Sequence, residues 1–526
     1  MTKQNAPTQR RVKGRKSAKV LNQGYGSHGA NAEKTSLAGW IAAAGSAIED
    51  IERNVDQLRT RSRDLYMGSP LAAGALKAIR TSVVGSGLKL NAQPDHEYLG
   101  MTQEEAEEWS SKVEREFSHW ADSINCDAQR MNNFYELQQL AFLSWLMSGD
   151  VFSLLPIIKR KGAIYDTRIY LIEADRIDTP NDSKGVSYFN NKIINGVEIA
   201  DFGEVIAYHI AQHHPNSIHF SAPQEWKRVL KFGEKTGRQN IIHLMESERP
   251  EQRRGVPILA PVIESLKQLS RYTEAELMAA VVNGFYTVFI KSQSPDEGPY
   301  GPSIPDDMQV DDEDDGTYEL GSGSVVGLAP GEEIQESNPS RPNQNFDGFV
   351  TSICRQIGTA LEIPYEVLLK HFTSSYSASR GALMEAWKMY KMRRAWLAND
   401  FCQPIYEEWL SEAVAKGRVE APGFFDDPLM RKAYCAAEWT GPSQGQLDPL
   451  KEVNAAEKRV KGGFSTRTRE TTELTGTDWK TNHRKRVMEE KLREEGGLKQ
   501  GEPNQSQPTD PPASNQDDDR EDDSDD

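Results

Sequence analysis

The chain has 526 residues, of which 37% are hydrophobic and 27% charged, and its formal net charge is -17. That length supplies apolar material for about two to four domains or one elongated chain of several regions, so a wholly disordered protein is excluded. The four cysteines are far apart and form no CxxC pair, which excludes a disulfide scaffold and a zinc ribbon and favours a reducing cytosol. No apolar run reaches the roughly 18–20 residues of a membrane span, and none follows the basic N-terminus as in a secretory signal.

The charge is concentrated at the two ends of the chain. Residues 1–20 contain seven Lys or Arg and no acid, whereas residues 501–526 contain ten acids and one Arg. Such blocks are typical of disorder, so we predict a disordered basic segment over 1–30 and a disordered acidic tail over 499–526. A third run, Asp306 to Asp315, has seven carboxylates in ten residues. It is expected to be a solvated loop, because it lacks the Gly and the distal Glu of a calcium-binding EF-hand.

Residues 31–255 predict a mixed α+β region in which the helices come first and the strands follow. Thr102 and Glu105 form a capping box ahead of one amphipathic helix. The other predicted helices are Leu37–Arg63, Leu71–Val84 and Phe134–Met147, and the predicted strands are Val151–Ile158, Thr167–Ile172 and Val205–Ile210.

Two helices and an insertion follow. Residues 256–284 predict one long helix with Pro257 in its first turn, and about 28 residues at 1.5 Å per residue make a rod of roughly 40 Å. Residues 346–362 predict a second helix, which ends before Pro364. Between them, residues 285–345 hold the acidic run and three expected strands: Tyr286–Lys291, Tyr318–Leu320 and Ser324–Leu328.

A polar segment and a very long helix come next. Residues 363–378 contain the sequence HFTSS, and Ser377 is placed as the N-cap of a helix that reaches Ala415. Pro404 lies deep inside that helix and predicts a kink, because proline removes a backbone hydrogen bond. Residues 379–440 are therefore expected to be a kinked long helix and its continuation, and residues 441–498 a mixed segment with short charged helices.

Signals for catalysis are weak. The chain has no GxxxxGK[ST], HExxH or GxSxG motif, and the segment Gly321 to Gly327 has the wrong spacing for a dinucleotide loop and predicts a hairpin. The histidines His209, His213, His214 and His219 are close in sequence, but Pro215 and the strand-like surroundings oppose the spacing of a zinc site. We expect no enzyme activity, no cofactor and no metal site.

The sequence of residues 343–387 is the most informative: NQNFDGFVTSICRQIGTALEIPYEVLLKHFTSSYSASRGALMEAW. It resembles the lambda-type portal proteins of tailed bacteriophages, in which IA-x-x-L-x-(I/V)-x-Y-E-x-L precedes a polar stretch, Y-S-x-x-R and a Trp. Gly358 departs from this pattern, in which Ala is common. Residues 448–466 resemble the family's C-terminal pattern, and the resemblance extends over most of residues 35–490. The matching positions are Ile357, Leu361, Ile363, Tyr365, Glu366, Leu368, Tyr376, Ser377, Arg380 and Trp387.

The resemblance implies an elongated α+β portal fold made of wing, stem, clip and crown. The implied regions are the wing 31–255, the stem helices 256–284 and 346–362, the clip 285–345, the tunnel loop 363–378, the kinked long helix with further wing 379–440, and the crown 441–498. It implies a homo-oligomeric ring, usually a dodecamer, at one capsid vertex of the virion, assembled in the host cytoplasm. Double-stranded DNA would pass through the ring during genome packaging and ejection. The implied protein partners are the terminase large subunit, head-completion or connector proteins, and the major capsid and scaffold proteins, with no membrane partner.

The tunnel loop supplies the predicted site residues. Lys370 and His371 are expected to touch the DNA backbone, with ordinary solvated loop residues as the alternative. Arg380 lies in the first turn of its helix, where the helix dipole disfavours a cation, so we expect it to pair with a carboxylate, in its own or a neighbouring subunit. The predicted DNA-facing residues are Lys370, His371, Phe372, Thr373, Ser374, Ser375 and Tyr376, and the predicted inter-subunit or loop-anchoring residues are Tyr376, Ser377 and Arg380.

Two alternatives remain open on sequence alone. A nucleic-acid-processing enzyme or motor component of the packaging machinery would need acidic metal ligands that converge on a folded core. A monomeric adaptor or scaffold would not need paired stem helices. The negative charge suits a conduit, because a chain that neutralised many phosphates would hold DNA tightly through counterion release.

Overall fold

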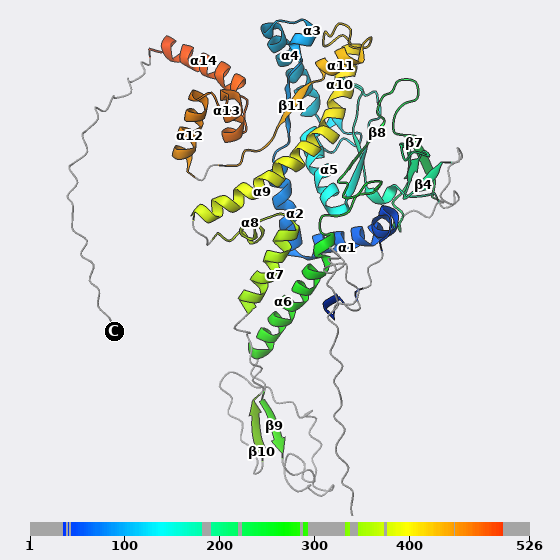
Figure 1. Ribbon diagram of the computed structural model, residues 1–526, viewed down its shortest axis with the longest axis vertical. Helices are drawn as coiled ribbons and strands as arrows, with labels where there is room; N and C mark the ends of the chain where they lie inside the picture. Colours follow the sequence, from blue (N-terminus) through cyan, green and yellow to red (C-terminus); the bar gives the residue numbers. More distant parts are fainter. Residues whose placement is uncertain are drawn as a thin grey trace, which may run out of the picture.

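The computed structural model describes residues 35–37, 40, 44–180, 191–218, 224–284, 288–292, 332–336, 346–372, 376–445 and 448–497. A broad main body carries two helices, α6 and α7, that project from it and lead to the β9–β10 pair at their far end (Figure 1). The expectations for residues 1–30, for the acidic run, for the strands Tyr318–Leu320 and Ser324–Leu328 and for the acidic tail lie outside the described residues. None of the described helices is long and apolar enough to span a membrane.

The N-terminal part of the main body is helical, as predicted. The capping box is confirmed, since the Glu105 amide donates to Thr102 Oγ1 at 3.2 Å and the Thr102 amide donates to Glu105 Oε2 at 2.8 Å. The prediction of one helix over Leu37–Arg63 was wrong: short turns η2 (Thr35–Leu37) and η3 (Ile48–Glu52) come first, because Gly45 and Ser46 disfavour a helix there. The helices are α1 (Val55–Gly68), α2 (Pro70–Val83), α3 (His96–Leu99), α4 (Gln103–Ala121) and α5 (Phe134–Ser148), and the 3-10 turn η4 (Ile124–Cys126) lies between α4 and α5.

The described strands of the main body form two small antiparallel sheets after α5, plus one pair that the sequence did not predict. The first sheet has the order β3-β2-β8 and the second β4-β5-β6-β7. The pair β1 (Lys89–Ala92) and β11 (Ala437–Thr440) brings the two ends of the main body together, with Lys89 opposite Thr440. The remaining strands are β2 (Asp150–Leu154), β3 (Tyr170–Ile172), β4 (Lys192–Ile194), β5 (Val197–Ile199), β6 (Val205–Ala211), β7 (Trp226–Leu230) and β8 (Ile241–Met245), with the 3-10 turn η5 (Ala174–Arg176) between β3 and β4.

The two projecting helices are named here the stem pair. The prediction that the first begins at residue 256 was wrong, because the Ile258 amide donates to the Leu146 carbonyl at 3.0 Å and ties this segment to α5. A 3-10 turn, η6 (Ala260–Val262), follows, and α6 runs from Ile263 to Gly284. The prediction of a second helix over residues 346–362 is confirmed as α7 (Phe346–Ala360). At the far end β9 (Val288–Ser292) overlaps the predicted strand Tyr286–Lys291 and extends one residue past it. It pairs with β10 (Glu332–Glu336), which the sequence did not predict.

The polar segment after α7 contains a short helix, α8 (Tyr365–Leu369), and the long helix then begins at Tyr376. Ser377 therefore lies inside the first turn of α9 (Tyr376–Leu397), and its placement as the N-cap was wrong. The predicted distortion is present as a π-helical turn, η7 (Ala398–Cys402), which places Pro404 in the first turn of α10 (Gln403–Ala415), where a missing amide is tolerated. The ribbon changes direction between α9 and α10 (Figure 1).

One large apolar core joins α1, α2, α4, α5, α9 and α10 with the base of the stem pair. Aromatic side chains dominate its centre: Phe117 lies 5.0 Å from Trp409 and 5.7 Å from Tyr406, ring centroid to ring centroid, both edge to face. A smaller core lies between the two sheets around Phe152 and Tyr208.

The chain after α10 makes one more helix of the main body, α11 (Pro428–Tyr434), before β11. Three further helices then form what we call the C-terminal module, residues 448–497. Its helices are α12 (Pro449–Lys461), α13 (Arg467–Thr475) and α14 (Trp479–Glu495).

Candidate functional site

The stem pair is held together by aromatic contacts near its middle. The Tyr272 ring stacks on Phe346 at 5.5 Å and meets Phe349 edge to face at 5.1 Å. Toward the main body the helices bury apolar residues such as Leu266 and Ile357. Farther out, the large apolar side chains of Leu277, Met278 and Phe349 are exposed. A helix pair with apolar side chains on its outer surface is suited to bind another protein surface.

The segment after α7 packs against the main body through its apolar residues. Ile363 and Leu368 are buried, and α8 lies between α7 and α2. Arg355 on α7 stacks over the Tyr365 ring, with its guanidinium carbon 5.2 Å from the ring centroid. These contacts fix the start of the predicted tunnel loop on a rigid base.

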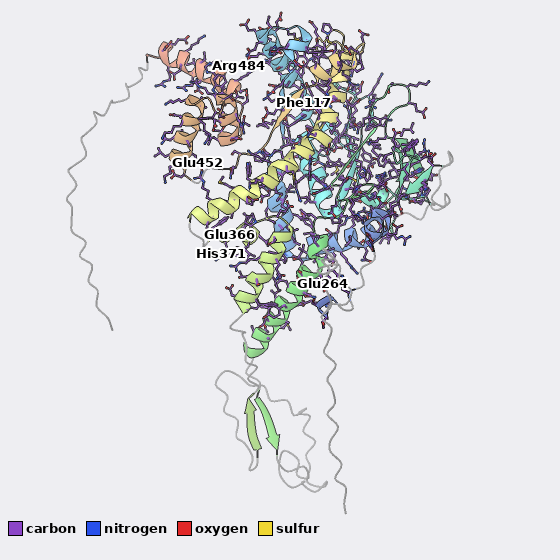
Figure 2. The ribbon with its side chains drawn as sticks, in the orientation of Figure 1. Phe117, Glu264, Glu366, His371, Glu452 and Arg484 are labelled. Atoms are coloured by element: carbon purple, nitrogen blue, oxygen red, sulfur yellow. The ribbon has the colours of Figure 1, made fainter. Side chains whose placement is uncertain are left out.

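The predicted DNA-facing residues begin where α8 ends. Lys370 adopts a left-handed conformation with φ of 54°, and the His371 amide donates to the Glu366 carbonyl at 3.0 Å, which turns the chain away from α8. Figure 2 labels Glu366 and His371 here, between α7 and α9. Lys370, His371 and Phe372 are exposed. Thr373, Ser374 and Ser375 lie outside the described residues, and only the backbone placement of Tyr376 and Ser377, in the first turn of α9, is described.

Arg380 on α9 lies next to a carboxylate of its own chain. Its Nη2 atom is 3.9 Å from Oε1 of Glu452 on α12, at the edge of the salt-bridge range. Both side chains keep some exposure to solvent, so this pair contributes little stability by itself. It links α9, which follows the predicted tunnel loop, to the C-terminal module.

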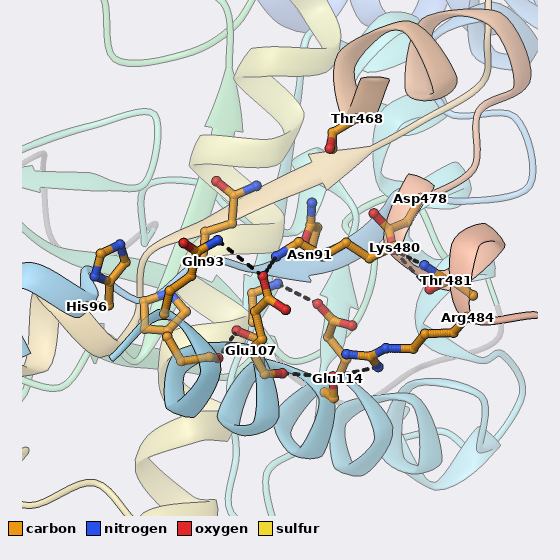
Figure 3. A pocket seen from close by; sticks show the side chains of 16 residues that line it. Asn91, Gln93, His96, Glu107, Glu114, Thr468, Asp478, Lys480, Thr481 and Arg484 are labelled. Atoms are coloured by element: carbon orange, nitrogen blue, oxygen red, sulfur yellow. Dashed lines mark hydrogen bonds and ion pairs between the residues drawn. The ribbon is translucent and has the colours of Figure 1, made fainter. Parts of the chain in front are cut away.

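The C-terminal module reaches the main body across a polar hollow of about 300 Å³ between α4, β1 and α14 (Figure 3). Lys480 Nζ lies 2.9 Å from Glu107 Oε1, and this contact holds the pKa of Glu107 below its usual value. Arg484 donates to Ser111 Oγ at 3.0 Å. At the floor of the hollow, burial raises the pKa of Glu114, whose carboxylate accepts a hydrogen bond from the Ala92 amide. The hollow has charges of both signs, so it works as a polar contact between two parts of the chain.

A buried ion cluster that the sequence did not predict lies at the start of β2. Asp150 is fully buried, and its carboxylate accepts from Arg254 Nε at 2.6 Å and from Arg59 Nη2 at 3.4 Å. Burial alone would raise the pKa of Asp150, but these guanidinium groups and the hydrogen bond from His243 hold it far below its usual range. Arg254 also donates to three backbone carbonyls, those of Ala174, Ile177 and Asn195. All donors of this arginine are thereby used in fixing the strands around it.

The same cluster fixes the point where the stem pair leaves the main body. Gly149 has φ of 90°, and a Cβ there would overlap the Gly255 carbonyl, so the two backbones cross with no room for side chains. Asp150 accepts from the Gly255 amide at 3.2 Å. The only sequence signal for this crossing was the Ser148-Gly149-Asp150 turn. The segment that it contacts, at Gly255, is more than a hundred residues away in the chain.

The four histidines that are close in sequence were not expected to form a zinc site, and the three within the described residues do not converge on one. His209 is buried, and its Nε2 atom lies 3.1 Å from Glu198 Oε2. The same oxygen accepts a hydrogen bond from Arg228 Nε at 2.7 Å. His219 lies outside the described residues, and no metal-ligand group of three His, Cys, Asp or Glu is found within the described ranges. The four cysteines are all buried and free, and burial raises the pKa of Cys126 to about 12.

These features are those of a structural, assembling protein, and comparison with known proteins identifies the class. The chain belongs to the phage portal protein family of the lambda type, whose family model matches residues 33–394. It is 25% identical over 482 residues to portal protein B of Escherichia phage lambda, covering 88% of this chain and 89% of the relative. It is 24% identical over 481 residues to the portal protein of Escherichia phage N15, with the same coverage of 88% and 89%.

Solved structures show a more distant likeness. The neck of a native gene transfer agent particle, computed with C12 symmetry, has 13% identity and a TM-score of 0.42 and covers 81% of this chain and 94% of that chain. An HK97 family portal protein from Corynebacterium diphtheriae has 11% identity and a TM-score of 0.29, with coverage of 75% and 96%.

Membership of the family gives the general role. The protein is a component of the phage virion at the capsid vertex, where the genome is packaged and ejected, and it is structural and not an enzyme. The alternative of a nucleic-acid-processing enzyme was therefore wrong. Portal family membership also implies an oligomeric ring.

Proposed function

We propose that twelve copies form a ring around a central DNA channel, with the regions arranged as wing, stem, clip, tunnel loop and crown. The stem pair supports this best, because its exposed apolar residues Leu277, Met278 and Phe349 require cover by a neighbouring copy. A ring is a heterologous assembly that closes by rotation, so each copy presents two different surfaces. In this arrangement residues 285–345 dock the terminase large subunit and later the head-completion or connector proteins. Major capsid and scaffold proteins contact the outer wing.

Native mass tests the ring. Light scattering should give about 700 kDa for twelve chains of 59.0 kDa each, and electron micrographs should show closed rings. The variant Leu277→Glu with Met278→Glu places charges on the stem surface and should reduce assembly strongly. A wild-type chain that remains a monomer under assembly conditions would contradict the proposal.

The tunnel loop is proposed to face the DNA, with Lys370 and His371 near its phosphates. Deletion of Thr373, Ser374 and Ser375 should leave the ring intact and reduce DNA packaging or retention. The matched control is deletion of three exposed turn residues of the main body, Glu234, Lys235 and Thr236, which should leave both unchanged. Loss of ring assembly in the loop variant would instead assign the loop a structural role.

A further inference from the structure

The C-terminal module lacks an apolar core of its own. Among its residues only Ala456 and Glu470 are buried, and no residue of the module belongs to either apolar core of the molecule. Its α12 and α13 are joined by the Arg459–Glu470 pair, with Nε–Oε1 at 2.8 Å and Nη2–Oε2 at 2.6 Å. The large exposed apolar side chains of the module are Leu450, Val453, Phe464, Val487, Met488 and Leu492.

The module is also loosely seated on the main body. Besides the hollow of Figure 3, hollows of about 600 and 450 Å³ lie between α9 and the module. Charged side chains bridge these spaces: Lys391 Nζ lies 3.3 Å from Glu473 Oε1, and Arg380 is near Glu452. Exposed pairs of this kind contribute about 0–1 kcal/mol each, so the module's own chain does little to stabilise it.

One helix of the module has a charge order that opposes its own stability. The first two turns of α14 contain Lys480, Arg484, Lys485 and Arg486, and its last two turns contain Glu489, Glu490, Glu494 and Glu495 beside only two cations. Cations near a helix N-terminus and anions near its C-terminus are disfavoured by the helix dipole. The side chains of Lys485, Arg486, Glu494 and Glu495 form no ion pair or hydrogen bond within the described chain. In the single subunit these exposed charges are solvated, and they are accessible to pair with charges of another surface.

The exposed residues of α14 form a stripe on one side of the helix. Lys485, Met488, Leu492 and Glu495 follow one another at steps of three, four and three, which places them on one helix face in the spacing of a and d positions. All four are exposed. The stripe is basic at one end, apolar in the middle and acidic at the other, so its two ends are complementary to each other.

We propose that this stripe binds a second copy of the chain, so that the acidic end of one α14 meets the basic end of the next around the ring. The inference rests on the ring proposed above and adds the surface that joins neighbouring C-terminal modules. A head-to-tail contact of this kind is heterologous, as ring closure requires, and its complementary charges set the register between copies. The neighbouring copy supplies the apolar cover that Met488 and Leu492 lack in their own subunit.

Cross-linking tests the contact directly. The variant Lys485→Cys with Glu495→Cys, treated with a short bismaleimide, should give a ladder of covalent oligomers up to the full ring. The four native cysteines are buried and give little background. The matched control is His483→Cys with Arg493→Cys, two exposed positions on the far side of α14 with the same ten-residue spacing, which should give no ladder. An equal ladder in the control, or dimers from Lys485→Cys alone, would overturn the inference.

Charge reversal supplies a second test with a rescue. Lys485→Glu with Arg486→Glu should raise the concentration needed for half assembly about tenfold, and Glu494→Lys with Glu495→Lys should do the same. All four changes together should restore assembly, because the complementary order is then merely inverted. Each reversal agrees better with the helix dipole, so circular dichroism should show no loss of helix. Additive loss in the fourfold variant would refute the head-to-tail contact.

The remaining outcomes separate this inference from the proposed function. If the wild-type chain remains a monomer, the ring itself fails. If rings form equally well in all reversal variants, only the α14 contact fails. Abolition of the cross-linked ladder by deletion of residues 501–526 would identify the acidic tail as the occupant of the stripe, and its abolition by added duplex DNA would identify nucleic acid; either result overturns the contact between copies.

Discussion

The main body and the C-terminal module are stabilised in opposite ways. The main body buries aromatic rings around Phe117 and a charged cluster around Asp150, both fully enclosed. The module buries almost nothing and holds its place through exposed pairs such as Lys480–Glu107. Packing and desolvated charges make the first region stable within one subunit, whereas the second depends on weak polar contacts that salt can screen. The monomer therefore contains a rigid part and a part completed by assembly.

The largest expected effect comes from removing the charge at the centre of the main body. Asp150→Asn leaves Arg254 buried without its counter-charge, removes one of the carboxylates beside Arg59, and should lower the free energy of unfolding by about 3–5 kcal/mol. Urea denaturation followed by tryptophan fluorescence measures this. Glu107→Gln, at the edge of the module, is the control and should cost less than about 1 kcal/mol. Equal losses would show that the two regions do not differ as described.

A comparable loss is expected from the aromatic core. Phe117→Ala removes the ring that contacts Trp409 and Tyr406 and should cost about 3–5 kcal/mol of monomer stability. Leu492→Ala removes an exposed apolar side chain of the module and should change monomer stability by no more than about 0.5 kcal/mol, while it weakens the ring. A large loss of monomer stability in Leu492→Ala would contradict the assignment of this residue to an interface.

A smaller effect depends on pH. Burial lowers the pKa of His243, so below a pH of about 6.5 the unfolded chain binds a proton that the folded chain does not, and stability falls as the pH drops from 7 to 5. The depressed pKa of Asp150 adds a second loss below a pH of about 4. The urea midpoints at pH 7 and 5 should lie closer together in His243→Gln than in the wild type, and the buried His209, whose pKa is also lowered, accounts for the remaining difference. They should remain apart in the control His483→Gln, which alters an exposed histidine of the module.

The smallest expected effect is on the seating of the module. Lys480→Ala removes the contact with Glu107 and should cost less than about 1 kcal/mol, visible as faster amide exchange in residues 91–93 and 478–484. Raising the salt from about 0.1 M to 1 M shortens the Debye length from about 10 to 3 Å and should have the same effect on the wild type. No change in exchange at high salt would mean that apolar contacts, and not charges, seat the module.

Much of the fold was predictable because it depends on local patterns. The capping box at Thr102, the helix Phe134–Met147 and the second stem helix follow from residues a few positions apart, and all were confirmed. The start of α6 was misplaced because Ile258 is held by a hydrogen bond to Leu146, a contact that no local pattern contains. The pair β1–β11 was missed for the same reason, since its strands have four residues each and lie about 345 positions apart.

Local sequence patterns were enough to identify the family, through the motif around Tyr365 and Arg380, and to order the helices along the chain, because helix periodicity and capping act over a few residues. The three-dimensional structure was needed to show that Asp150, Arg59, Arg254 and His243 meet in one buried cluster that fixes the stem pair to the main body. Only it showed that the apolar and charged residues of α14 are left exposed. Burial and pairing of charges depend on which distant segments fold against one another, and no spacing in the sequence records that.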